Sequence, residues 1–271
     1  MKLGYRLLAV DIDGMLKVPG ESISSVVFKS LKACIEKGVL VVPATGKKLS
    51  SIESICSDLG LKGEVITCNG SLVFRFPEKE LLSCSFLDSA SADVILADLA
   101  EDQRVSLAVF TVEDIVSTEG SYASEVLARI GEPTTLVVPR LAEISPHQIA
   151  KVLAAVKPDE SIARVYGQYH SRYYSLCSIT ITSDAFVEFM APGVSKGKAL
   201  ATICDARRIN RSRIIALGDS DNDLSMFDVA GLSVAVANCT EKVAEAADLI
   251  VASAAENGVA AAVRQLILDR D

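Results

Sequence analysis

The sequence lacks paired cysteines, long apolar runs and a signal-peptide pattern. Its seven cysteines are odd in number and scattered, with none in a C-x-x-C spacing, which favours neither a zinc site nor a disulfide framework. We expect most of them to be small core residues in a reducing compartment. No apolar run reaches about 18 residues without a charge, and no apolar segment with a cleavage site follows the N-terminus. The cytoplasm is therefore the expected location.

Positive charge is also scarce. The formal net charge is -8, which leaves no basic surface for a nucleic-acid backbone and repels anionic lipid head groups. We therefore expect no nucleic-acid partner and no membrane partner, and small molecules as ligands. Half of the 271 residues are apolar, so the chain can bury the core of one large domain or two smaller ones.

Strand and helix patterns alternate in two separate parts of the chain. Residues 1–76 read as strand, helix, strand, helix, strand, and the same alternation returns from about residue 195 to the end. This predicts an α/β fold with a Rossmann-like, doubly wound parallel sheet. We expect one core made of residues 1–79 and 191–271, interrupted by an inserted α+β domain of residues 80–190.

The inserted segment differs from the core in its secondary-structure pattern, with helical stretches between strand-like runs. The predicted helices are Ser91–Leu99 and Pro146–Val156, and the predicted strands are Val105–Val112 and Ser178–Thr182.

Two acidic residues follow the first apolar run. Asp11 and Asp13 stand one residue apart after Leu7–Val10, and Gly14 allows a sharp turn directly behind them. A buried strand ending in this way holds two carboxylates at the rim of a sheet. Taken alone, the pattern is equally typical of a turn or a helix cap.

A strand end and a helix start offer groups that attract an anion. Thr45 and Gly46 follow the second strand and precede a helix, where exposed N–H groups and the helix dipole form a phosphate cradle. Taken alone, Thr-Gly after a strand is more often turn chemistry. Lys196 opens a later helix, an unfavourable place for a cation unless an anion compensates it.

A further strand, Ile214–Leu217, runs into a strongly acidic turn. Asp219, Asp221 and Asp223 repel one another there unless a cation binds, and hard oxygen ligands select magnesium. A helix cap with an acidic first turn explains one or two of these residues. The spacing is not that of an EF-hand loop.

Together, in this order, these motifs resemble those of the haloacid dehalogenase superfamily. The resemblance extends to Ile66–Gly70, Gly193–Gly197 and Glu256–Ala260, which are similar to its Cof-like sugar-phosphatase branch, where a large α/β cap lies between the second and third motifs. It covers both core segments, roughly 155 residues. For the inserted segment it rests on position and size.

The resemblance implies a magnesium-dependent phosphomonoesterase acting on a small phosphorylated metabolite such as a sugar phosphate, phosphoglycolate or a cofactor phosphate. Asp11 would be the nucleophile that forms an aspartyl-phosphate, and Asp13 the general acid and base. Magnesium would be held by Asp11, the backbone carbonyl of Asp13, Asp219 and Asp223, the last directly or through water. Thr45, Gly46 and Lys196 would bind the phosphoryl group.

Two positions depart from the family pattern. In addition, one stretch of the inserted segment contains candidate substrate-binding residues. Met15 stands where the family usually has threonine, and Lys47 where it usually has arginine, which keeps the charge but loses the planar fork. In the polar aromatic stretch Tyr166–Tyr174, His170 and Arg172 are candidates for contacting the substrate. An exposed hairpin with half-buried tyrosines is an equally good interpretation of that stretch.

Two other functions share parts of this pattern. A phosphomutase or other phosphotransferase would use the same aspartyl-phosphate with an acceptor other than water. A phosphate-binding module without catalysis would need neither Asp13 as a general acid nor the large insertion, so the sequence favours the phosphatase.

Overall fold

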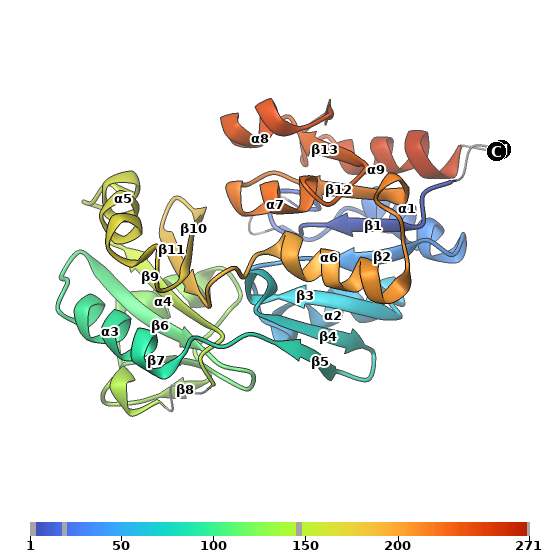
Figure 1. The fold of residues 1–271 in the computed structure, drawn as a ribbon. Helices are drawn as coiled ribbons and strands as arrows, with labels where there is room; N and C mark the ends of the chain where they lie inside the picture. The colour runs from blue at the N-terminus through green and yellow to red at the C-terminus, as the bar shows by residue number, and fades with distance from the viewer. Residues whose placement is uncertain (1–3, 18–20, 145–147, 270–271) are drawn as a thin grey trace.

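The computed structural model describes residues 4–17, 21–144 and 148–269. Its central sheet has five parallel strands in the order β14-β13-β12-β1-β2. These strands are β1 (Leu7–Val10), β2 (Leu40–Pro43), β12 (Ile214–Gly218), β13 (Leu232–Val236) and β14 (Leu249–Val251). The predicted parallel sheet is therefore confirmed, and β1 lies between β2 of its own chain segment and β12, the first strand of this sheet in the second segment (Figure 1).

Helices cover both faces of this sheet. Leu8 and Val10 of β1 pack on one side with α1, α2 and α9, while Leu7 and Ala9 face α6, α7 and α8 on the other. The helices of the first face are α1 (Ser25–Glu36), α2 (Leu49–Leu59) and α9 (Gly258–Val263), which continues into a π-helical turn, Arg264–Leu268. Those of the second face are α6 (Lys196–Arg207), α7 (Leu224–Phe227) and α8 (Glu241–Ala246). This arrangement is the doubly wound fold that the sequence predicts.

A smaller antiparallel sheet extends the edge beyond β2. It consists of β3 (Gly63–Thr67), β4 (Leu72–Phe76) and β5 (Glu80–Cys84). Ile66 of β3 forms a parallel bridge with Ala44, directly after β2. The third expected strand thus touches the central sheet at one point and pairs mainly with the hairpin that follows it. The short 3₁₀ helix Cys68–Gly70 connects β3 to β4.

A second large sheet is built within residues 105–190. Its order is β10-β11-β9-β6-β7-β8, with only β7 and β8 parallel. The strands are β6 (Val105–Phe110), β7 (Ile115–Ser117), β8 (Leu136–Val137), β9 (Lys151–Val156), β10 (Ser178–Ser183) and β11 (Phe186–Met190). The helices beside it are α3 (Ser89–Ala100), α4 (Tyr122–Arg129) and α5 (Ile162–Tyr173). We call this sheet with its three helices the cap; the division of the chain at residues 80 and 190 stays a prediction.

Two local predictions are wrong. The segment expected as a helix, Pro146–Val156, contains strand β9, which is buried on both sides between β6 and β11; a short run that is apolar on both faces fits a helix or a central strand equally well. Its residues 146 and 147 lie outside the described residues. The hairpin interpretation of Tyr166–Tyr174 also fails, because Val165, Tyr169 and Tyr173 recur at helical spacing and bury one face of α5.

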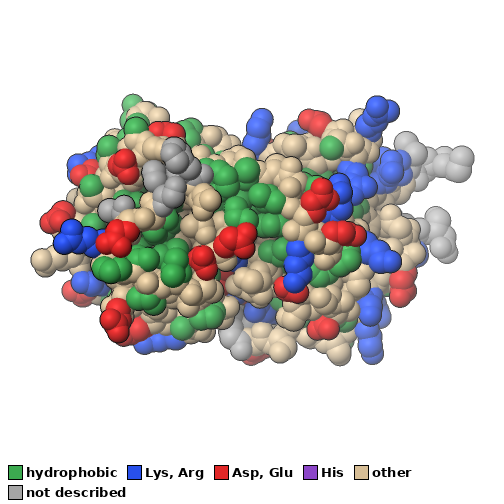
Figure 2. Space-filling view, turned by 90° about the horizontal axis from the view of Figure 1, so that it is seen from below, with side chains coloured by type: hydrophobic (Ala, Val, Ile, Leu, Met, Phe, Trp, Pro, Cys, Tyr) green, Lys and Arg blue, Asp and Glu red, His purple; other side chains and the backbone are tan. Residues whose placement is uncertain are grey.

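The cap packs directly on the core. One buried apolar cluster contains residues of β1, α1 and α2 together with Ala108, Phe110 and Leu153 of the cap sheet. In Figure 1 the chain passes from the core to the cap after β5 and returns between β11 and α6. On the face shown in Figure 2, acidic and basic side chains are interspersed among apolar ones.

Within the described ranges, every helix is too short or too polar to cross a bilayer.

Candidate active site

Three strand ends meet at one edge of the central sheet. Asp11 follows β1, and its backbone N–H donates to Leu217 of β12 at 3.1 Å. On the other side of β1, the N–H of Ala44 donates to the carbonyl of Val10 at 2.9 Å. The parallel register therefore brings Asp11 between the turn after β2 and the acidic turn after β12, because the carboxyl ends of parallel strands lie at the same edge.

Lys196 joins two of the acidic residues. It is the first residue of α6, whose N-cap Ser195 accepts a hydrogen bond from the N–H of Lys198 at 3.1 Å. Its Nζ lies 2.6 Å from Oδ1 of Asp11 and 2.7 Å from Oδ1 of Asp223. Burial lowers the pKa of Lys196, but the two carboxylates outweigh this and raise its pKa above the ordinary value. The lysine therefore stays charged, as expected for a cation that neutralises an acidic site.

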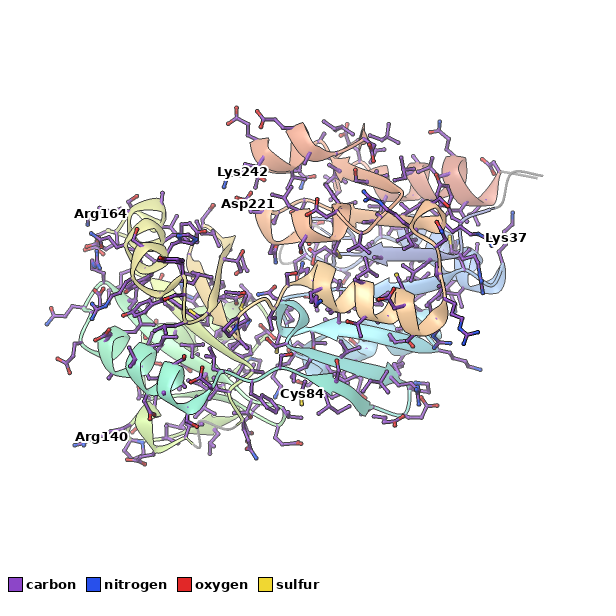
Figure 3. The ribbon with its side chains drawn as sticks, viewed as in Figure 1. Lys37, Cys84, Arg140, Arg164, Asp221 and Lys242 are labelled. Atoms are coloured by element: carbon purple, nitrogen blue, oxygen red, sulfur yellow. The ribbon has the colours of Figure 1, made fainter. Side chains whose placement is uncertain are left out.

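The acidic turn presents two carboxylates inward and one outward. Oδ2 of Asp223 accepts the N–H groups of Asp219 and Ser220, at 3.0 and 3.1 Å. Asp221 points away and contacts Thr240 at 2.8 Å and Lys242 at 2.6 Å (Figure 3). Helix capping therefore explains part of Asp223's role, and an outer ion pair explains Asp221.

Asp11, Asp219 and Asp223 form a buried cluster suited to a cation. One carboxylate oxygen of each lies within 4.8 Å of the others, and Oδ1 of Asp219 is buried without a hydrogen-bond partner. Burial, and then the neighbouring Asp223, raise the pKa of Asp219 to about 7. Burial also raises the pKa of Asp11 well above its ordinary value, although Lys196 lowers it. An unpaired oxygen among hard ligands fits magnesium.

Asp13 lies at the solvent side of this cluster. Its Oδ2 is 3.1 Å from Nζ of Lys47, and its Oδ1 is 3.3 Å from Nζ of Lys17. Gly14 behind it has φ of +80°, and a Cβ there would come within 2.3 Å of Oδ2 of Asp219. Only glycine lets this turn approach the acidic loop so closely. Met15, one of the two family departures, is fully buried in the apolar core.

The turn after β2 is held from several sides. Thr45 is buried, and its Oγ1 accepts the N–H of Lys47 at 3.1 Å. The N–H of Thr45 donates to Ile66 at 2.9 Å, and the carbonyl of Gly46 accepts from Nζ of Lys151 of the cap at 2.7 Å. Thr45 and Gly46 thus lie beside Asp11 in a tightly bonded turn.

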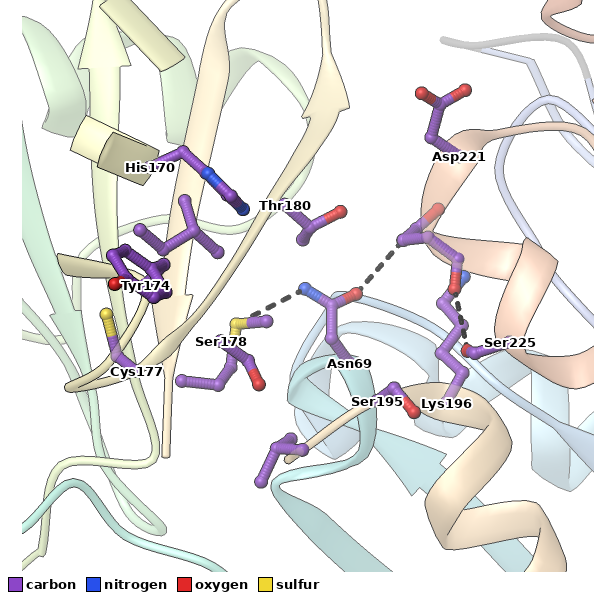
Figure 4. Close-up of a pocket in the computed structure, with 14 residues that line it drawn as sticks. Asn69, His170, Tyr174, Cys177, Ser178, Thr180, Ser195, Lys196, Asp221 and Ser225 are labelled. Carbon is purple, nitrogen blue, oxygen red and sulfur yellow. Dashed lines mark hydrogen bonds between the residues drawn. The ribbon is translucent and has the colours of Figure 1, made fainter. Parts of the chain in front are cut away.

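A pocket of about 360 Å³ opens between this site and the cap. Lys196 and Asn222 line it from the core, and His170, Thr180 and Met190 line it from the cap (Figure 4). The guanidinium of Arg172 is instead 2.6 Å from Asp98 of α3, away from the pocket's lining residues. Of the two cap residues predicted to contact a substrate, only His170 faces the pocket.

Sequence reasoning missed a set of buried polar residues at the junction of cap and core. Lys151 and Glu188 lie 2.6 Å apart, and Glu188 also accepts from Nδ2 of Asn69. Asn69 in turn accepts from Nδ2 of Asn222 in the acidic turn, at 3.1 Å. The available signal was a charged residue inside an apolar strand, as in Phe186–Met190, because a buried charge needs a partner.

Comparisons with known proteins agree with this geometry. The family model described as haloacid dehalogenase-like hydrolase matches residues 8–263. A 5-amino-6-(5-phospho-D-ribitylamino)uracil phosphatase of Bacillus subtilis is 28% identical over 267 residues, covering 97% of this chain and 96% of the relative. A phosphoglycolate phosphatase of Methanopyrus kandleri is 26% identical, with 98% of each chain covered.

A solved structure shows the same overall arrangement. A haloacid dehalogenase-like hydrolase from Bacteroides thetaiotaomicron superposes with a TM-score of 0.84 at 25% identity, covering 97% of this chain and all of that one. The likeness therefore extends through the inserted segment, for which the sequence offered only position and size.

Proposed function

Because this chain belongs to the haloacid dehalogenase-like hydrolases, we propose that it is a magnesium-dependent phosphomonoesterase that hydrolyses a small phosphorylated metabolite. The observation that carries the proposal is the buried cluster at the carboxyl edge of the sheet, in which Lys196 bridges Asp11 and Asp223 beside Asp219. The candidate substrates are a sugar phosphate, phosphoglycolate or a cofactor phosphate. The two relatives act, by name, on esters of this class.

Magnesium would be held by Asp11, Asp219 and the backbone carbonyl of Asp13, with Asp223 bound directly or through water. The unpaired Oδ1 of Asp219 supports this ligand set. When bound, the ion supplies positive charge against the phosphoryl oxygens. Lys196 adds a second positive charge, which lets a phosphate dianion enter a site with several carboxylates.

In the first chemical step, a carboxylate oxygen of Asp11 attacks the phosphorus and the bond to the leaving oxygen breaks. Lys196 donates to Oδ1 of Asp11, so we assign the attack to Oδ2. Asp13 gives its proton to the leaving oxygen, which departs as an alcohol. Lys47 and Lys17 orient the Asp13 carboxyl at the edge of the cluster.

In the second step, water attacks the phosphorus of the aspartyl-phosphate. Asp13 takes a proton from that water, inorganic phosphate leaves, and Asp11 returns to its carboxylate form. Thr45, through its hydroxyl, and Gly46, through its backbone N–H, would hold the phosphoryl oxygens through both steps. Two easier steps replace one of the slowest uncatalysed reactions in water.

The cap would choose the leaving group. The pocket beside Lys196 is lined by both polar and apolar side chains, with His170 and Thr180 on the cap side. Hydrogen-bonding groups next to a small apolar wall suit a compact hydroxylated metabolite. Lying over the site, the cap would also exclude water other than the attacking one.

The test is phosphate release from p-nitrophenyl phosphate by the purified protein. We expect turnover with magnesium, none with excess chelator, and none in the Asp11→Asn variant. The exposed Asp205→Asn variant serves as the matched control and should keep full activity. Undiminished turnover in Asp11→Asn, or in chelator, would refute the mechanism. A screen of phosphorylated metabolites then identifies the substrate.

A further inference from the structure

The cap sheet holds a buried ammonium group against the core. Lys151 is the first residue of β9 and is 1% exposed. Its Nζ lies 2.6 Å from Oε1 of Glu188, 3.9 Å from the centre of the Phe110 ring and 2.7 Å from the carbonyl oxygen of Gly46. Burial lowers the pKa of Lys151, but Glu188, Cys68 and Glu132 together outweigh this and raise it. A charged group therefore donates to a backbone carbonyl of the proposed phosphate-binding turn.

A buried ion pair of this kind is a poor device for stability alone. Removing two charges from water costs several kcal/mol, and well-packed apolar residues often serve the fold as well or better. Here Lys151 and Glu188 do more than neutralise each other, because both also form hydrogen bonds with the core. Glu188 accepts from Asn69, and Lys151 donates to Gly46.

The contact with Gly46 sets the direction of the next hydrogen bond. The peptide between Gly46 and Lys47 is planar, so fixing the carbonyl on one side fixes the N–H on the other. That N–H, on Lys47, donates to Oγ1 of Thr45 at 3.1 Å. With the oxygen of Thr45 engaged as an acceptor, its hydroxyl hydrogen is left to donate to an anion.

We propose that Lys151 of the cap is a positioning residue that aims the Thr45 hydroxyl at the phosphoryl group through the Gly46–Lys47 peptide. This inference rests on the proposed function, since it takes Thr45 as a ligand of the phosphoryl oxygens. It gives the cap a role in phosphate binding itself, in addition to selecting the leaving group. Lys151 would therefore matter for every substrate, including inorganic phosphate, which has no leaving group.

A second buried lysine supplies a matched control. Lys48 also lies at the cap–core junction and donates from Nζ to the carbonyls of Thr111 and Val112, at 3.1 and 2.9 Å. Its side chain ties the cap to the same turn but does not touch the Gly46 carbonyl. Lys48→Met therefore removes cap–core hydrogen bonds of the same kind and leaves the path from Lys151 to Thr45 intact.

The experiment measures the dissociation constant of inorganic phosphate by calorimetry, with magnesium present. The test variant is Lys151→Met/Glu188→Gln, which removes the ammonium without leaving a buried carboxylate unpaired. We expect its dissociation constant to rise about tenfold, the scale of one lost hydrogen bond to a charged group. Lys48→Met should stay within about twofold of the parent protein. An equal rise in Lys48→Met would show that phosphate binding depends on any hydrogen bond between cap and core, and would overturn the proposal.

A double-mutant cycle tests whether Lys151 acts through Thr45. In a Thr45→Val background, the same pair of substitutions should change the dissociation constant by less than about twofold, because the hydroxyl to be aimed is gone. A tenfold rise that persists in Thr45→Val, or no rise in the parent background, would refute the inference. A parent protein that binds no phosphate would instead refute the proposed function.

Folding of the variants is checked by circular dichroism and cooperative thermal unfolding. If Lys151→Met/Glu188→Gln does not fold, Lys151→Gln/Glu188→Gln replaces it. The two glutamine amides can hydrogen-bond to each other, while Gln at position 151 is too short to reach the carbonyl of Gly46. Failure of both variants to fold would overturn the proposal, because the pair would then be a requirement of the fold.

Discussion

The ammonium group of Lys196 lies 2.6 Å from Oδ1 of Asp11, and both side chains are buried at the edge of the central sheet. The two residues are 185 positions apart in the chain, one at the end of the first strand and the other at the start of α6. Their contact neutralises one negative charge at this edge. In the proposed mechanism a phosphate dianion approaches here, and the contact leaves Oδ2 of Asp11 for the attack.

Replacing Lys196 should therefore lower the rate of catalysis. We expect Lys196→Met to lower kcat about 10²–10³-fold, the usual loss when one group that stabilises developing charge is removed. The exposed Lys198, on the same helix turn, supplies the control: Lys198→Met should keep kcat within about twofold. Steady-state kinetics on p-nitrophenyl phosphate measure both. Equal activity of Lys196→Met and the parent enzyme would contradict the assignment.

Gly14 is expected to matter for its missing side chain as well as its backbone angle. Gly14→Ala places a Cβ 2.3 Å from Oδ2 of Asp219 at φ of +80°, so it should lose both stability and magnesium affinity. Gly38 has nearly the same angle, φ of +78°, with no atom within 4 Å of its Cβ position. Gly38→Ala should cost about 1–2 kcal/mol of unfolding free energy and leave magnesium affinity unchanged. Urea unfolding and magnesium titration of both variants separate strain from steric contact, and equal magnesium affinities would contradict the prediction.

The sequence predicted the core and the cluster well because both follow from local patterns. Short apolar runs mark parallel strands, and residues after such strands gather at one edge. That rule alone brings Asp11, Thr45 and Asp219 together. Lys196 was recognisable because a cation at a helix N-terminus needs an anion nearby.

The cap was harder to predict, because its key contacts depend on how one sheet packs against the other. Lys151 and Gly46 are 105 residues apart, and no periodicity relates them. The charge of Glu188 in an apolar strand indicated a buried partner but not which one. Strand β9 was predicted as a helix for another reason: its residues are buried on both faces, a pattern that fits a helix or a central strand.

Magnesium binding should depend on Asp219 and on pH. Burial and Asp223 raise the pKa of Asp219 to about 7, so the folded apo protein keeps a proton that the unfolded chain loses near pH 4. Apo stability from this group should therefore fall as pH rises from about 4 to about 7. Magnesium binds the ionised form, so its stabilising effect should grow over the same window.

Thermal unfolding with and without magnesium, measured between pH 5 and pH 8, tests this. Asp219→Asn should remove most of the magnesium-dependent rise in Tm. Asp221→Asn is the control two residues away, because Asp221 pairs with Lys242 and Thr240 outside the cluster, and it should keep the rise. A magnesium effect that is independent of pH, or equal in the two variants, would contradict the role of Asp219.

His170 and Arg172 should differ in their effect on substrate choice although both lie on the exposed part of α5. His170 lines the pocket, whereas Arg172 is paired with Asp98 at 2.6 Å. We expect His170→Ala to lower kcat/KM about tenfold for the best metabolite found in a screen, the scale of one or two lost polar contacts. For acetyl phosphate, whose leaving group is too small to fill the pocket, the same variant should stay within about twofold. Arg172→Ala should leave both values within that range. A substrate-selective loss in Arg172→Ala but not in His170→Ala would show that the contact belongs to Arg172 and would contradict the prediction.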